Sequence, residues 1–298
     1  MNIKFNFYDI YGFALPGFLL VAVLWLPFGL IQKNWPDPQL SSAVIGIVLV
    51  YIAGHLLQTV ARHVLPSRLP NGRFPSSVFL DRGDGTFSDS FKKRIAGQIH
   101  FAFGLDVFPE LPAHKGDEVP TAVDHVRDEA LFLCRSALIK SKTVSYAEQF
   151  EGLYALMRGF SAAFAFAFVY YLGWAYSSLL RWQGTGYLIV LGIIGALITI
   201  LTGRRSNAAR RVTAAFLLLA AFASGHYLGQ LVVGTSEHRN LFLAGTLLSV
   251  FAFERCYGSY KAFAQEFVKA IYRDFYLYET PGAASKPNAG QADAVVVE

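Results

Sequence analysis

Residues 159–180 read GFSAAFAFAFVYYLGWAYSSLL and contain no charged side chain. A helix needs about 20 such residues to cross the hydrocarbon core of a bilayer, which is about 30 Å thick. Aromatic side chains gather toward the end of this stretch, as is typical of the membrane–water interface. The stretch therefore predicts a transmembrane helix and, with it, an integral membrane protein of the all-α class.

Five further apolar stretches are long enough, or nearly so, to cross a membrane. They predict five more spans, at 11–31, 43–57, 187–202, 212–233 and 241–253. The composition agrees, because 54% of the 298 residues are hydrophobic and only 16% are charged. Soluble domains carry about 25% charged residues, so the composition excludes an ordinary soluble protein.

The positive charges test this layout, because cytoplasmic loops of membrane proteins carry an excess of lysine and arginine. With the N-terminus in the cytoplasm, six spans place 22 of the 26 lysine and arginine residues on the cytoplasmic side. With five spans, the basic segment after Phe253 would lie outside. The sequence therefore predicts six spans with both termini in the cytoplasm, and most of the net charge of +5 reflects topology.

The spans and the polar segments divide the chain into five parts. We expect a transmembrane hairpin at 1–65, a cytoplasmic helical domain inserted at 66–157, a four-span bundle at 158–257, a cytoplasmic amphipathic helix at 258–279 and a disordered tail at 280–298. In the polar domain, four-residue spacing of apolar residues predicts a helix that Ser88 caps and Gly104 ends, and a second helix begins near Thr121. Helical patterns over 144–182 and 241–278 exceed the thickness of a bilayer, so both should continue into the cytoplasm.

The sequence holds no catalytic signature. Walker loops, nucleophile elbows, HExxH pairs and CxxC sets are all absent. Cys134 and Cys256 lie more than a hundred residues apart, which predicts neither a disulfide framework nor a metal set. We therefore expect no enzyme, no cofactor and no bound metal.

Four polar residues lie within or near the apolar stretches: His55 and Gln58 in the second span, and His226 and Gln230 in the fifth. Polar groups inside a bilayer usually face the interior of a helix bundle or an aqueous path. These four could line a pore, or they could form hydrogen bonds between packed helices. Both roles remain open at this point.

A second candidate site is the basic cluster Lys92, Lys93 and Arg94, with Arg82 nearby in the sequence. Cations in the first turns of a helix are unfavourable because of the helix dipole. An anionic ligand, such as a nucleotide or an oligonucleotide, could bind there. A basic belt that faces anionic lipid is the other explanation.

Small residues are dense in the third to fifth spans, where Ala163, Ala167, Gly225 and Gly229 would let helices approach closely. This packing could join helices of one chain or of several chains. Six short spans without an internal repeat enclose little volume, so we expect a homo-oligomer.

Two short motifs are similar to those of known proteins. The first is Tyr8-Asp9-Ile10-Tyr11-Gly12 followed by Pro16-Gly17, which resembles the start of many small multi-pass bacterial inner-membrane proteins. The second is Ala147-Glu148-Gln149-Phe150 followed by Arg158-Gly159, at the entry to the third span. In its order of spans and soluble segment, the chain resembles the Hailong channel-forming effectors of anti-phage defence, whose soluble crown binds a DNA oligomer.

The resemblance implies a bacterial inner-membrane location and a nucleotide or oligonucleotide ligand, which only the basic positions Lys92, Lys93, Arg94 and Arg82 could bind. The leading hypothesis is an oligomeric inner-membrane effector or ion channel, regulated through its cytoplasmic head and acting in anti-phage defence. The alternative is a non-conducting membrane scaffold that docks a cytoplasmic protein partner on the head.

Overall fold

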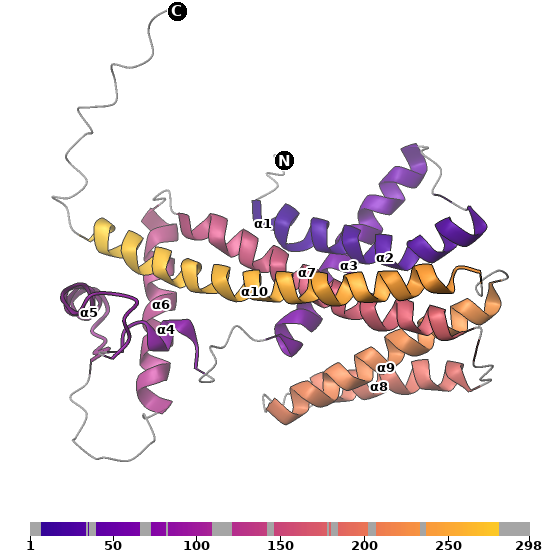
Figure 1. Cartoon of the computed structure of the whole chain (residues 1–298). Helices are drawn as coiled ribbons and strands as arrows, with labels where there is room; N and C mark the ends of the chain where they lie inside the picture. Colours follow the sequence, from indigo (N-terminus) through magenta and orange to yellow (C-terminus); the bar gives the residue numbers. More distant parts are fainter. Residues whose placement is uncertain are drawn as a thin grey trace, which may run out of the picture. The chain divides into compact units, whose positions relative to one another are not determined.

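The computed structural model of the protein describes residues 7–33, 35, 40–65, 73–81, 83–108, 121–141, 146–177, 179, 184–201, 207–232 and 237–279. Within these ranges all regular structure is helical (Figure 1), which confirms the all-α class. The elements are α1 (Phe7–Asp9), the π-helix η1 (Ile10–Ala14), α2 (Leu15–Gln32), α3 (Leu40–Val64), α4 (Pro75–Val78), α5 (Asp89–Phe103), α6 (Thr121–Ser141), α7 (Tyr146–Tyr176), α8 (Thr185–Leu201), α9 (Asn207–Leu231) and α10 (Arg239–Tyr278).

Five helical segments are long and apolar enough to cross a membrane, and they indicate a membrane protein. They are Ile10–Gln32, Ala43–Val64, Tyr146–Tyr176, Ala208–Leu231 and Arg239–Tyr278. The remaining predicted span corresponds to α8, which is apolar but has only 17 residues. At 1.5 Å per residue it is about 26 Å long, a little less than the hydrocarbon core.

The chain divides into two compact units. Unit 1 comprises Met1–Pro66 and Gly152–Ala262, and unit 2 comprises Ser67–Glu151 and Phe263–Glu298. The long helices α7 and α10 each contribute residues to both units. The tail predicted to be disordered, at 280–298, lies outside the described residues.

Helices of unit 1 pack at very short range through glycine. A Cβ atom at Gly225 of α9 would overlap the carbonyl oxygen of Tyr170, and one at Gly173 of α7 would overlap that of Phe222. The backbones of α7 and α9 therefore touch, which only glycine permits at these two positions. Aromatic side chains fill the space beside this contact, and Tyr170 Oη donates a hydrogen bond to the carbonyl oxygen of Leu24, 3.2 Å away.

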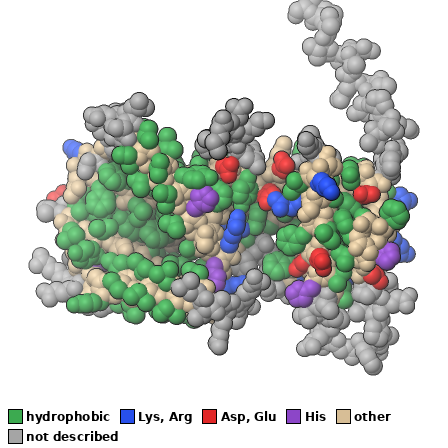
Figure 2. Space-filling view, turned by 180° about the vertical axis from the view of Figure 1, so that it is seen from behind, with side chains coloured by type: hydrophobic (Ala, Val, Ile, Leu, Met, Phe, Trp, Pro, Cys, Tyr) green, Lys and Arg blue, Asp and Glu red, His purple; other side chains and the backbone are tan. Residues whose placement is uncertain are grey.

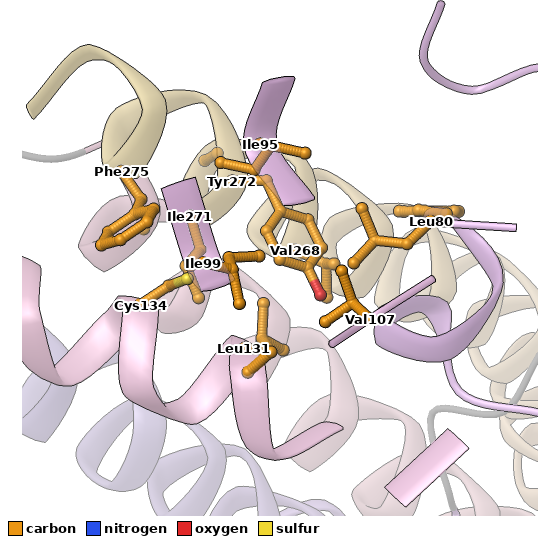
Figure 3. Packing of buried hydrophobic residues seen from close by; sticks show 14 of the residues in the cluster. Leu80, Ile95, Ile99, Val107, Leu131, Cys134, Val268, Ile271, Tyr272 and Phe275 are labelled. Carbon is orange, nitrogen blue, oxygen red and sulfur yellow. The ribbon is translucent and has the colours of Figure 1, made fainter. Parts of the chain in front are cut away.

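Unit 2 has its own hydrophobic core (Figure 3). Ile95 and Ile99 of α5 are fully buried in it, together with Cys134 of α6 and Ile271 and Phe275 of α10. Burial raises the pKa of the Cys134 thiol, so the side chain behaves as an apolar group.

The predicted limits of α5 are confirmed. The Ser88 hydroxyl accepts a hydrogen bond from the backbone N–H of Phe91 at 3.3 Å, which is the N-cap contact. Gly104 follows the last helical residue with a φ of 70°, a left-handed conformation that glycine adopts without steric cost.

Unit 1 exposes a broad apolar surface. Figure 2 shows wide areas of hydrophobic side chains on one face of the molecule. On α3, seven large hydrophobic residues are more than half exposed: Val44, Ile45, Ile47, Val48, Leu49, Ile52 and Leu56. Contiguous exposed apolar area of this kind marks contact with lipid or with other protein rather than with water.

We expect Gly225→Val to prevent the folding of unit 1, because the added side chain would force α7 and α9 apart. Gly46→Val on α3 is the matched control, since a Cβ there meets nothing within 4 Å. Fluorescence-detected size exclusion and melting in detergent measure the effect. A Gly225→Val protein that eluted and melted like the parent would contradict the close packing.

Candidate functional site

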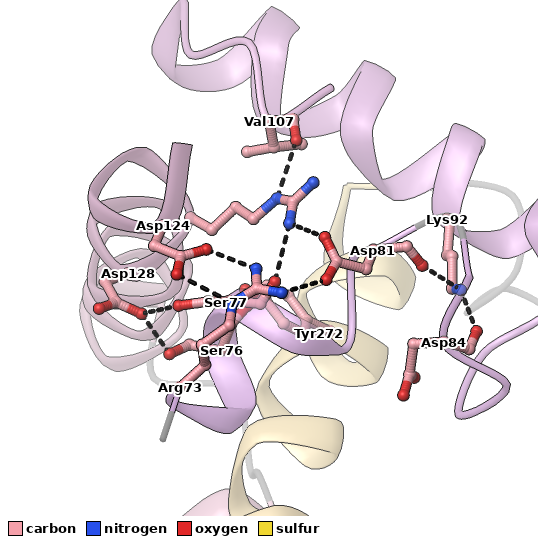
Figure 4. A network of polar contacts seen from close by, with 11 residues as sticks. Arg73, Ser76, Ser77, Asp81, Asp84, Lys92, Val107, Asp124, Asp128 and Tyr272 are labelled. Atoms are coloured by element: carbon pink, nitrogen blue, oxygen red, sulfur yellow. Dashed lines mark hydrogen bonds and ion pairs between the residues drawn. The ribbon is translucent and has the colours of Figure 1, made fainter. Parts of the chain in front are cut away.

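Lys92, which belongs to the predicted anion site, has a buried ammonium group. The residue is only 1% exposed, and Nζ donates hydrogen bonds to the carbonyl oxygens of Asp81, at 2.5 Å, and Asp84. Figure 4 shows the side chain pointing into the loop that these two residues form. The ammonium is therefore used inside unit 2, and it is not presented to a ligand in this arrangement.

Lys93 and Arg94 differ from Lys92, because both are exposed. Arg94 lines an open groove of about 500 Å³ on unit 2, together with Gly97, Gln98, Phe101, Tyr276 and Glu279. Arg94 Nη1 lies 3.4 Å from the hydroxyl of Tyr276, and the Phe101 ring is 89% exposed. Arg82, the fourth predicted residue, lies outside the described residues.

Beside Lys92, unit 2 holds a network of arginine and aspartate side chains (Figure 4). Arg73 binds both carboxylate oxygens of Asp124, at 2.9 and 2.5 Å, and one oxygen of Asp81 at 2.6 Å. Arg127 pairs with the other oxygen of Asp81 and donates to the carbonyl oxygens of Ser77 and Val107. The hydrogen bonds that Arg73 donates to Asp124 and Asp81 raise the pKa of its guanidinium, so Arg73 stays charged, and the network fixes α4 against α6.

The residues predicted to line a pore do not gather at one place. Gln58 of α3 is buried and contacts α7 near Gly159, whereas His55 is exposed and stacks on Phe13 with ring centroids 3.8 Å apart. His226 of α9 is buried, and its backbone lies against Gly173, also on α7. Since Gly159 and Gly173 are 14 residues apart, these contacts lie about 21 Å apart along α7.

Gln58 forms hydrogen bonds between helices. Its Nε2 donates to the carbonyl oxygen of Ala155 at 2.6 Å. Its Oε1 accepts from Nε and Nη2 of Arg158, at 3.0 and 2.9 Å. Gln230, on the same helix as His226, is half-buried.

Arg158 is the residue that Gln58 holds. It is only 4% exposed, and no other lysine, arginine or carboxylate side chain is buried among the described residues of unit 1. Its third contact is Nη1 to the hydroxyl of Tyr154 at 2.6 Å. None of the described carboxylates forms an ion pair with it. Unit 1 therefore contains a buried cation held by neutral acceptors.

These contacts continue to α10 through Tyr154. Its ring stacks on that of Tyr260, with centroids 5.4 Å apart, and Tyr260 Oη donates to the carbonyl oxygen of Leu65 at 2.7 Å. We call Gln58, Leu65, Tyr154, Arg158 and Tyr260 the junction cluster. It connects α7 and α10 to α3 and to Leu65, the residue that follows α3.

The junction cluster lies at the edge of unit 1 in the chain. The chain passes between the units at Pro66/Ser67, Glu151/Gly152 and Ala262/Phe263. Leu65, Tyr154 and Tyr260 each lie within three residues of one of these points. Every covalent connection between the units therefore lies within three residues of a member of the cluster.

The sequence alone does not reveal this cluster. In the sequence, Arg158 is only one of many basic residues predicted to lie in the cytoplasm, because its acceptor Gln58 is 100 residues away. A signal does exist, since Arg158 directly precedes the apolar stretch 159–180, which begins with a glycine. A Cβ at Gly159 would lie 2.6 Å from Pro16 Cβ and 2.7 Å from Gln58 Nε2, so the glycine lets Gln58 reach α7.

The chain matches no protein-family model, no curated protein and no solved structure. Fold and site therefore define only a class, an all-α membrane protein with one unit of long apolar helices and a second, more polar helical unit.

We expect Gln58→Leu to destabilise the protein by about 1–3 kcal/mol, because it leaves two buried guanidinium donors without an acceptor. Adding Arg158→Leu should recover part of this loss, since the pair is then replaced by apolar groups. Melting in detergent measures both, with Thr59→Val as the control, because that exposed hydroxyl bonds only within its own helix. Additive effects of the two leucine substitutions would contradict the coupling.

We expect Lys92→Met to destabilise unit 2 by about 1–3 kcal/mol, since the carbonyl oxygens of Asp81 and Asp84 lose a buried donor. Lys93→Met changes an exposed neighbour and should have little effect. Limited proteolysis of the full chain in detergent reports on unit 2. Equal protease resistance of the two variants would show that the buried ammonium is dispensable.

Proposed function

We propose that this protein is a multi-pass protein of the bacterial inner membrane that opens an ion-conducting path as a homo-oligomer, and that unit 2 controls the opening from the cytoplasm. The apolar helices of unit 1 and their wide uncovered surface support the membrane and oligomer parts of this proposal. The excess of lysine and arginine in the loops supports the cytoplasmic location of both termini. We further propose that α8 completes a set of six spans, with modest tilting or thinning to match its length.

The junction cluster is the observation that carries the proposal. A regulated channel needs an element that has two discrete arrangements and that both the sensor and the pore can bias. Each of the three chain connections to unit 2 lies within three residues of a cluster residue. The cluster is held by hydrogen bonds and a ring stack rather than by apolar contacts alone. Such contacts are directional, so movement of one connection strains the others.

For the ligand of unit 2, we propose an anion bound at the groove that Arg94 lines. An arginine beside an exposed aromatic ring is suited to a nucleotide or oligonucleotide, because the two groups can contact a phosphate and a base face. Lys93, exposed on the same helix, adds positive charge. Lys92 is left out, because its ammonium is bonded inside unit 2.

The full-length protein in planar bilayers tests the channel. We expect conductance that responds to unit 2 ligands, and we expect Tyr260→Phe to shift the balance of open and closed states by up to about tenfold, the worth of one hydrogen bond. That variant keeps the ring stack and loses only the bond to the carbonyl oxygen of Leu65. Tyr257→Phe, one turn earlier on α10, is the matched control.

Absence of conductance from the parent protein, with and without nucleotides or oligonucleotides, would overturn the proposal. A non-conducting scaffold that docks a protein partner on unit 2 would then be the better interpretation. The ligand is tested separately by Lys93→Glu combined with Arg94→Glu, which leaves Lys92 in place. Unchanged oligonucleotide binding by that variant would remove the groove as the binding site.

A further inference from the structure

One end of unit 1 collects positive charge from four helices. Contacts between the four helices show which of their segments lie side by side. His63 Nε2 of α3 lies 3.3 Å from Thr213 Oγ1 of α9. Tyr260 of α10 is hydrogen-bonded to Leu65 and stacked on Tyr154 of α7. We call the lysine and arginine residues near these contacts the cationic end. They are Arg62 of α3, Arg158 of α7, Arg210 and Arg211 of α9, and Arg255 and Lys261 of α10.

Acidic residues are fewer there. Among the described residues, the carboxylates near these contacts are Glu151, which pairs with Arg135, Glu254, beside Arg255 in the chain, and Asp9, which follows Tyr8. The Tyr8 hydroxyl accepts a hydrogen bond from Arg62. Three of the six cations are exposed: Arg62, Arg211 and Arg255. The end therefore carries net positive charge, and much of it faces outward.

Topology alone accounts for basic residues at a cytoplasmic end, but not for the burial of Arg158. A topogenic arginine can extend its side chain into the headgroup region. Arg158 instead points into the bundle, is 4% exposed, and contacts the neutral acceptors Gln58 and Tyr154. Its charge is kept among the helices and is not cancelled by a carboxylate.

We propose that the ion path of this protein selects anions, with the cationic end as its selective mouth. This inference rests on the channel function proposed above. Pores lined by arginine and lysine favour anions, because the positive potential concentrates them and repels cations. A path through unit 1 that opens at this end lies within reach of cations from four helices, since screening acts over about 8 Å at physiological ionic strength.

The test measures the reversal potential of the full-length protein in bilayers of neutral lipid under a KCl gradient. We expect a reversal potential of the sign of the chloride equilibrium potential, opposite to that of potassium. Arg62→Gln removes one exposed charge and should lower the chloride-to-potassium permeability ratio by about twofold. Arg158→Gln should lower it as well, whereas Arg158→Lys keeps the charge and should preserve selectivity.

Arg239→Gln is the matched control. Arg239 is exposed and begins α10, 16 residues before Arg255, so it lies about 24 Å from the nearest residue of the cationic end on that helix. If the parent conducts but prefers potassium, or if Arg62→Gln and Arg239→Gln leave the same ratio, the anion inference is wrong and the channel function stands. If the parent does not conduct at all, the channel function fails and this inference fails with it.

Discussion

The bond between the Arg158 guanidinium and the Gln58 amide is the constraint on which unit 1 depends. A buried charge is stable only if its donors have acceptors, because burial removes the water molecules that would otherwise hydrate it. Here the acceptors come from α3 and from the preceding turn of α7, so the position of one helix fixes the other. Gly159 is part of the same constraint, since any larger side chain would separate Gln58 from the helix it binds.

The two units are both built from helices, but they distribute apolar side chains in opposite ways. Unit 2 buries isoleucine, valine and phenylalanine in a closed core and fixes its loops with arginine–aspartate pairs. Unit 1 turns large aliphatic side chains outward and packs inward through glycine and aromatic rings. Because α7 and α10 each run through both environments, their sequences change character along one uninterrupted helix.

Much of the fold can be predicted because it depends on local chemistry. Apolar stretches give the helices that are long and apolar enough to cross a membrane, and four-residue spacing of apolar residues between Ser88 and Gly104 gives α5 and its limits. The candidate sites depend instead on contacts between distant segments. Lys92 resembles its exposed neighbours in sequence, and only the path of the loop at Asp81 and Asp84 brings two carbonyl oxygens to its ammonium. Arg158 is equally ambiguous until α3 brings Gln58 to it.

The amide at position 58 bears on the anion selectivity that we propose. A carboxylate there could accept the same two hydrogen bonds from Arg158, and the pair would be electrically neutral. The amide accepts them with a partial charge only, and its Nε2 donates to the carbonyl oxygen of Ala155, a bond that a carboxylate could not make. The cluster therefore holds the guanidinium in place and leaves its charge acting on its surroundings. An element built only for tight packing would not need that uncancelled charge, whereas a mouth that attracts anions does.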